Sequence, residues 1–208
     1  MLDASQSAGC LPVDMKRLGA AFVAMPGHKS LYGPQGTGIL LCKAGAEPLL
    51  YGGTGSLSRL QEMPEMLPDR LEAGTHNVCG VAGLLEGIRF VRKKGIARIL
   101  KHERILLDST VRRLSTIKGM QCFKAENEAE QAGVLSIRMD GWDCEELGEE
   151  LGRRGIAVRA GLHCAPLAHQ TVGTLESGTV RISFSAFNSR EEIERLGMVL
   201  EGLSRKKK

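Results

Sequence analysis

Apolar residues recur at two different spacings along this chain. Near the N-terminus, short apolar runs over 20–25 and 39–41 alternate with turns that contain glycine and proline, as in the strands of α/β units. Further along, the spacing takes the period of an amphipathic helix, with apolar residues at Val81, Leu84, Leu85, Ile88 and Val91. Gly95 interrupts this period, so we expect the helix to end there.

The rest of the chain predicts a small α+β domain. A second helix is expected over 96–117, and strands are expected over 135–139 and 180–184, where apolar and polar residues alternate. Two further helices are predicted by capping boxes, in which a polar residue is followed three positions later by glutamate: Asp143 with Glu146, and Ser189 with Glu192.

The segment 52–68 follows neither spacing and is expected to form a long loop, a kind of segment that is often functional in a compact domain. Together these patterns predict an α/β fold with two domains, one over 1–95 and the other over 96–208.

Composition excludes several classes of protein. Of the 208 residues, 42% are apolar and 25% are charged, which is ordinary for a soluble globular protein. No apolar run approaches the roughly 18 residues of a membrane-spanning helix, and no signal-peptide pattern is visible, so no membrane partner is expected. The net charge of +4 comes partly from a basic tail over 205–208, which is typical of a solvated chain end and predicts no nucleic-acid partner.

The six cysteines are scattered, without a Cys-x-x-Cys pair or the density of a disulfide framework. This spacing favours a reducing compartment, and we expect the protein to be cytoplasmic.

Lys29 is the first candidate for chemistry, because it lies between His28 and a glycine-rich turn, directly after an apolar run. Proteins of the α/β class place ligand-binding groups at strand ends. A lysine amine that is partly desolvated there can have a lowered pKa and form a Schiff base. The alternative is an ordinary surface lysine beside a flexible turn.

Four segments, taken in order, resemble a known family: Asp3 with Gln6, the run 27–38 around Lys29, the run 159–166 around Cys164, and the run 178–184 around Arg181. They resemble the class V aminotransferase family of fold-type I, pyridoxal-phosphate-dependent enzymes, most closely its branch of cysteine desulfurases and selenocysteine lyases. The resemblance extends through nearly all of the chain. It implies that 1–95 is the later half of the cofactor-binding large domain and that 96–208 is the small C-terminal domain.

The resemblance also implies a cofactor-binding set. Asp3 would pair with the pyridine nitrogen of pyridoxal phosphate, Gln6 would bind its phenolic oxygen, His28 would face its phosphate, and Lys29 would form the Schiff base. The alternative is that Asp3 caps a turn and Gln6 is solvated. Many relatives have a serine two residues before this histidine, whereas Pro26 here has neither a hydroxyl nor an N–H donor.

The segment 70–75 resembles a family segment that crosses a dimer interface, where Thr75 would contact the phosphate of the partner's cofactor. The alternative is that Thr75 caps the helix that follows. The resemblance therefore implies a homodimer.

Cys164 follows Arg159 and His163, and the resemblance implies that its thiolate attacks the sulfur of the substrate. Nearby cations generally lower the pKa of a thiol and so favour this chemistry. The alternative is an inert buried cysteine, which we expect the other five cysteines to be.

Arg181 would bind the carboxylate of the substrate with its planar guanidinium, and Arg159 is a second candidate for this role. The alternative is a surface arginine on an edge strand. His102 and His169 match no role, and His102 is expected to be solvated.

The implied activity is removal of sulfur from L-cysteine, which leaves alanine and a persulfide on Cys164. The expected partners are a small-molecule substrate, cysteine or selenocysteine, and a sulfur-acceptor protein. Two alternatives stay open: a selenocysteine lyase or another class V aminotransferase, and a non-catalytic fragment that only folds or dimerises. A complete member of the family would have a long segment before Asp3, so the chain resembles the C-terminal part of a longer protein.

Overall fold

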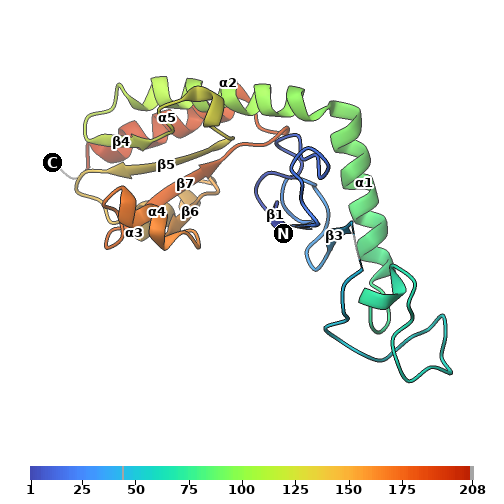
Figure 1. Ribbon diagram of the computed structural model, residues 1–208. Coiled ribbons are helices and arrows are strands. Elements are labelled where there is room, and N and C mark those ends of the chain that lie inside the picture. Colours follow the sequence, from blue (N-terminus) through green and yellow to red (C-terminus); the bar gives the residue numbers. More distant parts are fainter. Residues whose placement is uncertain (44, 207–208) are drawn as a thin grey trace. The chain divides into compact units, whose positions relative to one another are not determined.

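The computed structural model describes residues 1–43 and 45–206 and divides the chain into two compact units, Met1–Ala97 and Arg98–Lys208 (Figure 1). Of the basic tail, the last two residues lie outside the described part. No helix in the described part is both long and apolar enough to cross a lipid bilayer. The assignment of these units to a large and a small domain of an enzyme stays a prediction.

The first unit contains a three-stranded sheet with the order β1-β2-β3. Strand β1 (Leu2–Asp3) runs parallel to β2 (Phe22–Pro26), and β3 (Gly38–Cys42) runs antiparallel to β2. Since parallel strands end at the same edge of a sheet, Asp3 and the turn after Pro26 share that edge. Burial differs along this sheet: Val23 in β2 is fully buried, whereas the β3 side chains of Leu40 and Leu41 are exposed.

The segment between β3 and the next helix has little regular structure, in line with the expected loop. Its regular element is the short 3₁₀ helix η1 (Asp69–Leu71). Arg70 anchors the segment, because its guanidinium donates to the carbonyl of Ala46 at 3.0 Å and forms an ion pair with Glu47 at 2.8 Å.

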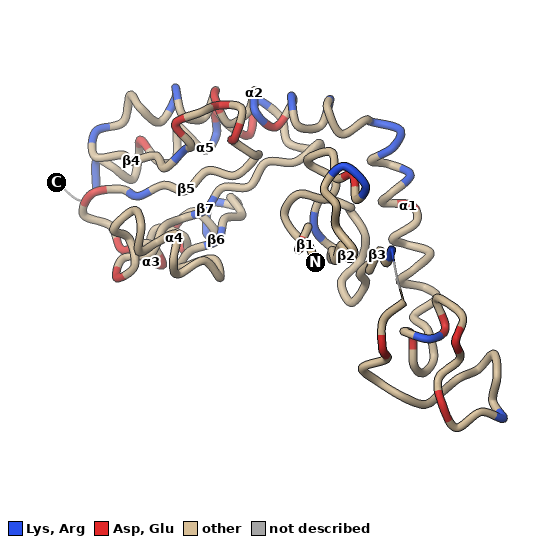
Figure 2. Tube along the Cα trace, viewed as in Figure 1, with Lys and Arg blue, Asp and Glu red and all other residues tan. Residues whose placement is uncertain are grey.

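Helix α1 (Val78–Lys94) begins three residues before the expected start, because Asn77 caps it by accepting a hydrogen bond from the backbone N–H of Gly80. Gly87 lets the helix pack directly on the chain after Lys29: a Cβ at this position would lie 2.3 Å from the carbonyl oxygen of Leu31. The helix ends at Gly95 as expected, and the basic residues of its last turn, 92–94 (blue in Figure 2), lie where the helix dipole favours cations.

The second unit contains an antiparallel sheet with the order β4-β5-β7-β6. Its strands are β4 (Met120–Phe123), β5 (Val134–Met139), β6 (Arg159–Gly161) and β7 (Thr179–Ser183). The inward residues of β5 and β7, among them Leu135, Ile137 and Val180, form one apolar core with three helices: α2 (Ile96–Leu114), α3 (Cys144–Arg153) and α5 (Arg190–Ser204).

The helix ends of this unit follow from local hydrogen bonds. Ser189 and Glu192 form the expected reciprocal capping box at α5, and Asp143 caps α3 by accepting from two backbone N–H groups. Helix α2 ends at Leu114 instead of residue 117, because the hydroxyls of Ser115 and Thr116 bond back to carbonyls of the last turn. The remaining elements are the 3₁₀ helix η2 (Glu128–Glu130) and α4 (Pro166–Thr171).

Candidate active site

Asp3 and Lys29 lie near each other at the ends of neighbouring strands in the first unit. The backbone N–H of Ser5 donates to Oδ1 of Asp3 at 2.8 Å. Hydrogen bonds from Ser5 lower the pKa of Asp3, and the positive charge of Lys29 lowers it further. Asp3 therefore stays a carboxylate, beside a primary amine.

The turns that carry these two groups are interlocked. The thiol of Cys10 lies 2.8 Å from the hydroxyl of Ser30, the residue that follows Lys29. Gly9 has a φ of 89°, and a Cβ on it would lie 2.1 Å from the carbonyl oxygen of Ser30. The chain after Asp3 and the chain after Lys29 thus fit together only with glycine at position 9. The sequence did not identify Gly9, Cys10 or Ser30, because their contact joins segments that are distant along the chain.

The expected cofactor-binding side chains are open to solvent in the described part of the chain. Gln6, His28, Lys29 and Thr75 are all exposed. Lys29 is exposed, so the described residues do not supply the partial desolvation that was considered for its amine. The capping alternative for Thr75 is also wrong, because Asn77 is the cap of α1. Among the described residues, no hydrogen bond or ion pair joins Thr75 to Asp3 or Lys29.

In the second unit, one row of side chains crosses the whole sheet. The register pairs Phe123 with Ser136, Ser136 with Arg181, and Arg181 with Arg159. Directly opposed residues of antiparallel strands point to the same face, so the two guanidinium groups share one surface. Since β7 is an inner strand, the alternative of an edge-strand arginine is wrong for Arg181.

This pair of arginines lacks a counter-charge among the described residues. No salt bridge from a described carboxylate reaches Arg159 or Arg181, and Nε of Arg181 is buried without a hydrogen-bond partner in the described part. Like charges directly opposite each other destabilise a sheet. An anion bound to both groups would relieve this repulsion and satisfy the buried donor.

Cys164 lies beside the same surface, in a strained turn. The N–H of Ala165 donates to the carbonyl of Leu162 at 2.9 Å, and the two residues between them have positive φ, 54° for His163 and 59° for Cys164. A left-handed conformation costs about 1–2 kcal/mol for a residue other than glycine. The exposed thiol lies 4.0 Å from Nη2 of Arg159. The turn thus places a thiol next to a guanidinium group.

His163 connects this turn to β7. Its Nε2 lies 3.1 Å from the carbonyl oxygen of Thr179 and 3.0 Å from the Thr179 hydroxyl. Burial lowers the pKa of His163, and the positive charges of Arg181 and Arg159 and the ring of His169 lower it further. The ring is therefore neutral at neutral pH, with the proton on Nε2, because a carbonyl can only accept. Its Nδ1 is buried without a partner in the described part of the chain.

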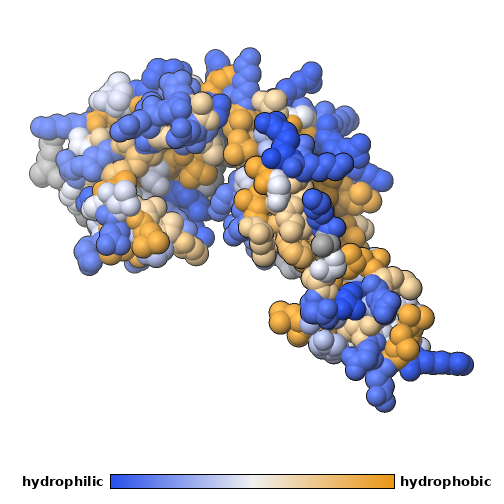
Figure 3. All heavy atoms as spheres, viewed as in Figure 1, coloured by the Kyte–Doolittle hydropathy of each residue, from blue (hydrophilic) through white to orange (hydrophobic). Residues whose placement is uncertain are grey.

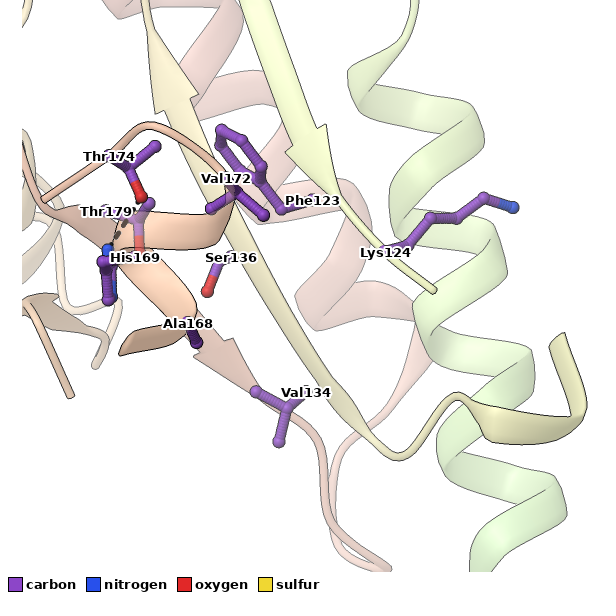
Figure 4. A pocket seen from close by; sticks show the side chains of 9 residues that line it. All are labelled: Phe123, Lys124, Val134, Ser136, Ala168, His169, Val172, Thr174 and Thr179. Atoms are coloured by element: carbon purple, nitrogen blue, oxygen red, sulfur yellow. Dashed lines mark hydrogen bonds between the residues drawn. The ribbon is translucent and has the colours of Figure 1, made fainter. Parts of the chain in front are cut away.

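A cavity of about 270 Å³ lies between α4 and the sheet (Figure 4). The hydroxyls of Ser136, Thr174 and Thr179 and the ring of His169 line it together with apolar side chains, while the Lys124 side chain extends away from it. His169 is buried, contacts Thr174 through Nδ1 at 2.8 Å and lies 5.6 Å, ring centre to ring centre, from His163. Cys164 does not line this cavity, whereas Phe123 and Ser136 of the row across the sheet do.

Two expectations about other side chains are wrong. Cys79 is exposed in the first turn of α1, whereas we expected every cysteine other than Cys164 to be buried. Cys122 and Cys144 fit that expectation better, since burial raises the pKa of both thiols. His102 is half-buried instead of solvated, and its Nε2 lies 2.9 Å from the carbonyl oxygen of Asn188.

The sequence matches the family described as "Aminotransferase class-V" over residues 1–196, and the chain belongs to this family of pyridoxal-phosphate-dependent enzymes. Relatives within the family include probable cysteine desulfurases. A probable cysteine desulfurase of Methanothermobacter thermautotrophicus is 36% identical over 98% of this chain and 52% of its own length. A probable cysteine desulfurase of Pyrococcus abyssi is 37% identical over 98% of this chain and 51% of its own length.

Solved structures agree with this assignment. The apo structure of a cysteine desulfurase from Thermococcus onnurineus matches with a TM-score of 0.86 at 35% identity, over 98% of this chain and 52% of that one. The S-sulfonic acid form of the cysteine desulfurase CsdA from Escherichia coli matches with a TM-score of 0.83 at 28% identity, over 97% of this chain and 50% of that one. The predicted family and the α/β, fold-type I architecture are confirmed. This chain spans about half the length of the relatives it matches.

Proposed function

We propose that this chain carries the residues of a cysteine desulfurase, which removes sulfur from L-cysteine, leaves alanine and receives the sulfur as a persulfide on Cys164. The observation that carries the proposal is the geometry of the second unit. The Cys164 thiol lies 4.0 Å from Arg159, and Arg159 lies opposite Arg181 on one face of the sheet. A nucleophile beside two cations without counter-charges suits a substrate that carries both a carboxylate and a sulfur atom.

The first unit would hold pyridoxal phosphate. The donor set fits this group, because an ionised Asp3 can pair with a protonated pyridine nitrogen and Lys29 beside it supplies the amine for covalent attachment. Gln6 would bind the phenolic oxygen, His28 would face the phosphate, and Thr75 would contact the phosphate of a partner subunit. When bound, the cofactor supplies an electron sink that stabilises negative charge on the carbon skeleton of the substrate.

The second unit would hold the substrate and accept its sulfur. Arg181, with Arg159 beside it, binds and orients the α-carboxylate. The Cys164 thiolate forms a bond to the substrate's sulfur while the bond between that sulfur and carbon breaks. The carbon keeps the electron pair and takes up a proton, so that alanine leaves and the sulfur stays on Cys164. Lys29 holds and returns protons at the α-carbon.

The assembly and location of the protein belong to the same proposal. A homodimer would give Thr75 its role, and a sulfur-acceptor protein would take the sulfur from the exposed Cys164. A reducing, cytoplasmic location is supported by the described cysteines, none of which forms a disulfide.

The function is tested by incubating the purified chain with pyridoxal phosphate and L-cysteine and by mapping which cysteine gains a sulfur atom by mass spectrometry. We expect the extra sulfur on Cys164 and no sulfide release from Cys164→Ser. Cys79→Ser removes the other exposed thiol and should release sulfide as the wild type does. Extra sulfur on a different cysteine contradicts the assignment of Cys164. The absence of extra sulfur on every cysteine favours the non-catalytic alternative.

The attachment point is tested by borohydride reduction of the cofactor-loaded chain, followed by peptide mapping. We expect the pyridoxyl group on Lys29, because Lys29 lies beside the Asp3 carboxylate. A pyridoxyl group on another lysine would overturn the cofactor site.

A further inference from the structure

The turn over 162–165 has a backbone that its own sequence does not favour. Both central residues have positive φ, the pattern of a type I′ turn, in which asparagine and glycine are preferred. Histidine tolerates this conformation better than most residues, but cysteine has no such tendency. Residues in such conformations persist only where the surrounding structure holds them, and they cluster at functional sites.

The contacts that anchor this turn to β7 come from His163. Its Nε2 donates toward two acceptors of one residue, the carbonyl oxygen and the hydroxyl of Thr179, at 3.1 and 3.0 Å. Thr179 is 1% exposed and lies in an inner strand of the sheet, so it is a fixed anchor. On its other side the ring of His163 packs against the buried ring of His169.

We propose that His163 is a positioning residue: by donating from Nε2 to Thr179, it holds the Cys164 turn in its left-handed conformation and keeps the thiol beside Arg159. The role deepens the proposed function, because it rests on Cys164 as the nucleophile. The contacts of His163 lie within the second unit, so this positioning can be tested without cofactor or substrate.

The position of the thiol controls its electrostatic surroundings. Arg159 lies on β6 and Arg181 on β7, and both face the turn with positive charge. A thiolate held next to Arg159 attracts anionic reagents more than a thiolate that has moved away. Since Cys164 is exposed, access does not limit its reaction with small reagents.

The experiment compares the alkylation of Cys164 by iodoacetate, an anion, with its alkylation by neutral iodoacetamide, quantified for this cysteine by peptide mass spectrometry at low salt. Both reagents react with the thiolate, so the ratio of the two rates cancels the thiolate fraction and reports the local charge. The benchmark is Arg159→Ala, which removes the cation and leaves His163 in place. The same chain in concentrated urea gives the reference ratio.

We expect Arg159→Ala to lower the ratio by about two- to fivefold, as a charge about 4 Å away does in a watery environment. His163→Phe keeps a ring but loses the donor, and should lower the ratio to the same level although Arg159 is still present. Thr179→Val removes the hydroxyl but keeps the carbonyl acceptor, and should give an intermediate ratio. If His163→Phe does not fold, the ratio in Thr179→Val tests the positioning role in its place.

The positioning role is overturned if Arg159→Ala lowers the ratio while His163→Phe keeps the wild-type ratio. If His163→Phe does not fold, a wild-type ratio in Thr179→Val overturns it instead. A wild-type ratio equal to that in urea overturns the contact between Cys164 and Arg159 itself. Neither result depends on sulfide release, so failure of this inference is distinguishable from failure of the proposed activity.

Discussion

At the scale of single residues, Gly9 and Gly36 form a natural pair for comparison. Both have positive φ, 89° and 75°, but a Cβ on Gly9 would meet Ser30 whereas a Cβ on Gly36 would meet nothing within 4 Å. We expect Gly36→Ala to lose about 1–2 kcal/mol of unfolding free energy from backbone strain alone. Gly9→Ala should lose about 1–3 kcal/mol more, because the chain after Lys29 must move.

Urea unfolding followed by circular dichroism measures this difference. Equal losses for the two variants would show that the close approach at Gly9 does not constrain the turn that carries Lys29.

Arg181 allows a second comparison at this scale. Arg181→Ala should weaken substrate binding by about 2–5 kcal/mol, the cost of leaving one partner of a buried charge pair without the other. Arg181→Lys should recover only part of the loss, since an ammonium group cannot form the two parallel hydrogen bonds of a guanidinium group with a carboxylate. The measurement is calorimetric titration of the cofactor-loaded chain with L-cysteine, and unchanged affinity in Arg181→Ala would exclude the carboxylate role.

The sequence identified chemical groups better than it identified their surroundings. Lys29 stands out because of its neighbours along the chain, whereas Asp3 and Cys164 were singled out by the resemblance of four segments taken in order. The support of Cys164 by Thr179 and the contact of Gly9 with Ser30 join residues far apart in sequence, so local patterns do not contain them. The exposure of Lys29 is likewise decided by tertiary structure.

At the scale of secondary-structure elements, helix α2 carries an acidic residue on its buried side. Glu103 is 3% exposed, and a Cβ on Gly133 would lie 2.6 Å from its Oε2, so the carboxyl group is packed against backbone. Burial raises the pKa of Glu103 from 4.5 to about 7. The folded chain therefore binds more protons than the unfolded chain between these two values, and its stability should fall as the pH rises from about 4.5 to about 7.

Glu103→Gln removes this titration. Above pH 7 the variant should be more stable than the wild type by about 2–3 kcal/mol, and the advantage should vanish below about pH 4.5, where the wild-type carboxyl group is neutral in both states. Urea unfolding across this pH range measures the effect, and the exposed Glu126→Gln is the control. An advantage that does not change with pH would contradict the burial of an ionisable group at this position.

Element ends were predicted well where a local hydrogen bond determines them, and less well elsewhere. The capping box at Ser189 and the glycine at position 95 mark the observed ends of α5 and α1. The start of α1 was missed by three residues. The apolar spacing was counted from Val81, whereas Asn77 caps the helix so that it begins at Val78. The strand order β4-β5-β7-β6 could not be predicted, since it depends on pairing between distant segments.

At the scale of the whole molecule, exposed apolar side chains gather on the first unit. Leu49, Leu50 and Tyr51 are 93%, 69% and 60% exposed, and Val78 and Val81 on α1 are 71% and 58% exposed. Figure 3 shows hydrophobic spheres in the lower part of the view. Clusters of this kind favour association. We therefore expect the purified chain to self-associate in a concentration-dependent manner.

Light scattering coupled to size-exclusion chromatography tests this expectation. The double variant Leu49→Ser with Leu50→Ser should shift the mass toward the monomer. Leu167→Ser, at a residue of the second unit that is 75% exposed, should leave the mass unchanged. A monomeric wild type at all concentrations would contradict the association.

The row Phe123–Ser136–Arg181–Arg159 exists only in one register of the strands, so the placing of both arginines on one face depends on that register. Side chains alternate between faces with a period of two, so a slip of β7 by one residue would bury the guanidinium group of Arg181 and place Val180 or Ile182 on this face. Core substitutions that loosen the register would therefore remove the proposed pair of arginines from this face while leaving both residues in the sequence. A single-residue insertion within β7 should remove the guanidinium group of Arg181 from this face as completely as a deletion of Arg181.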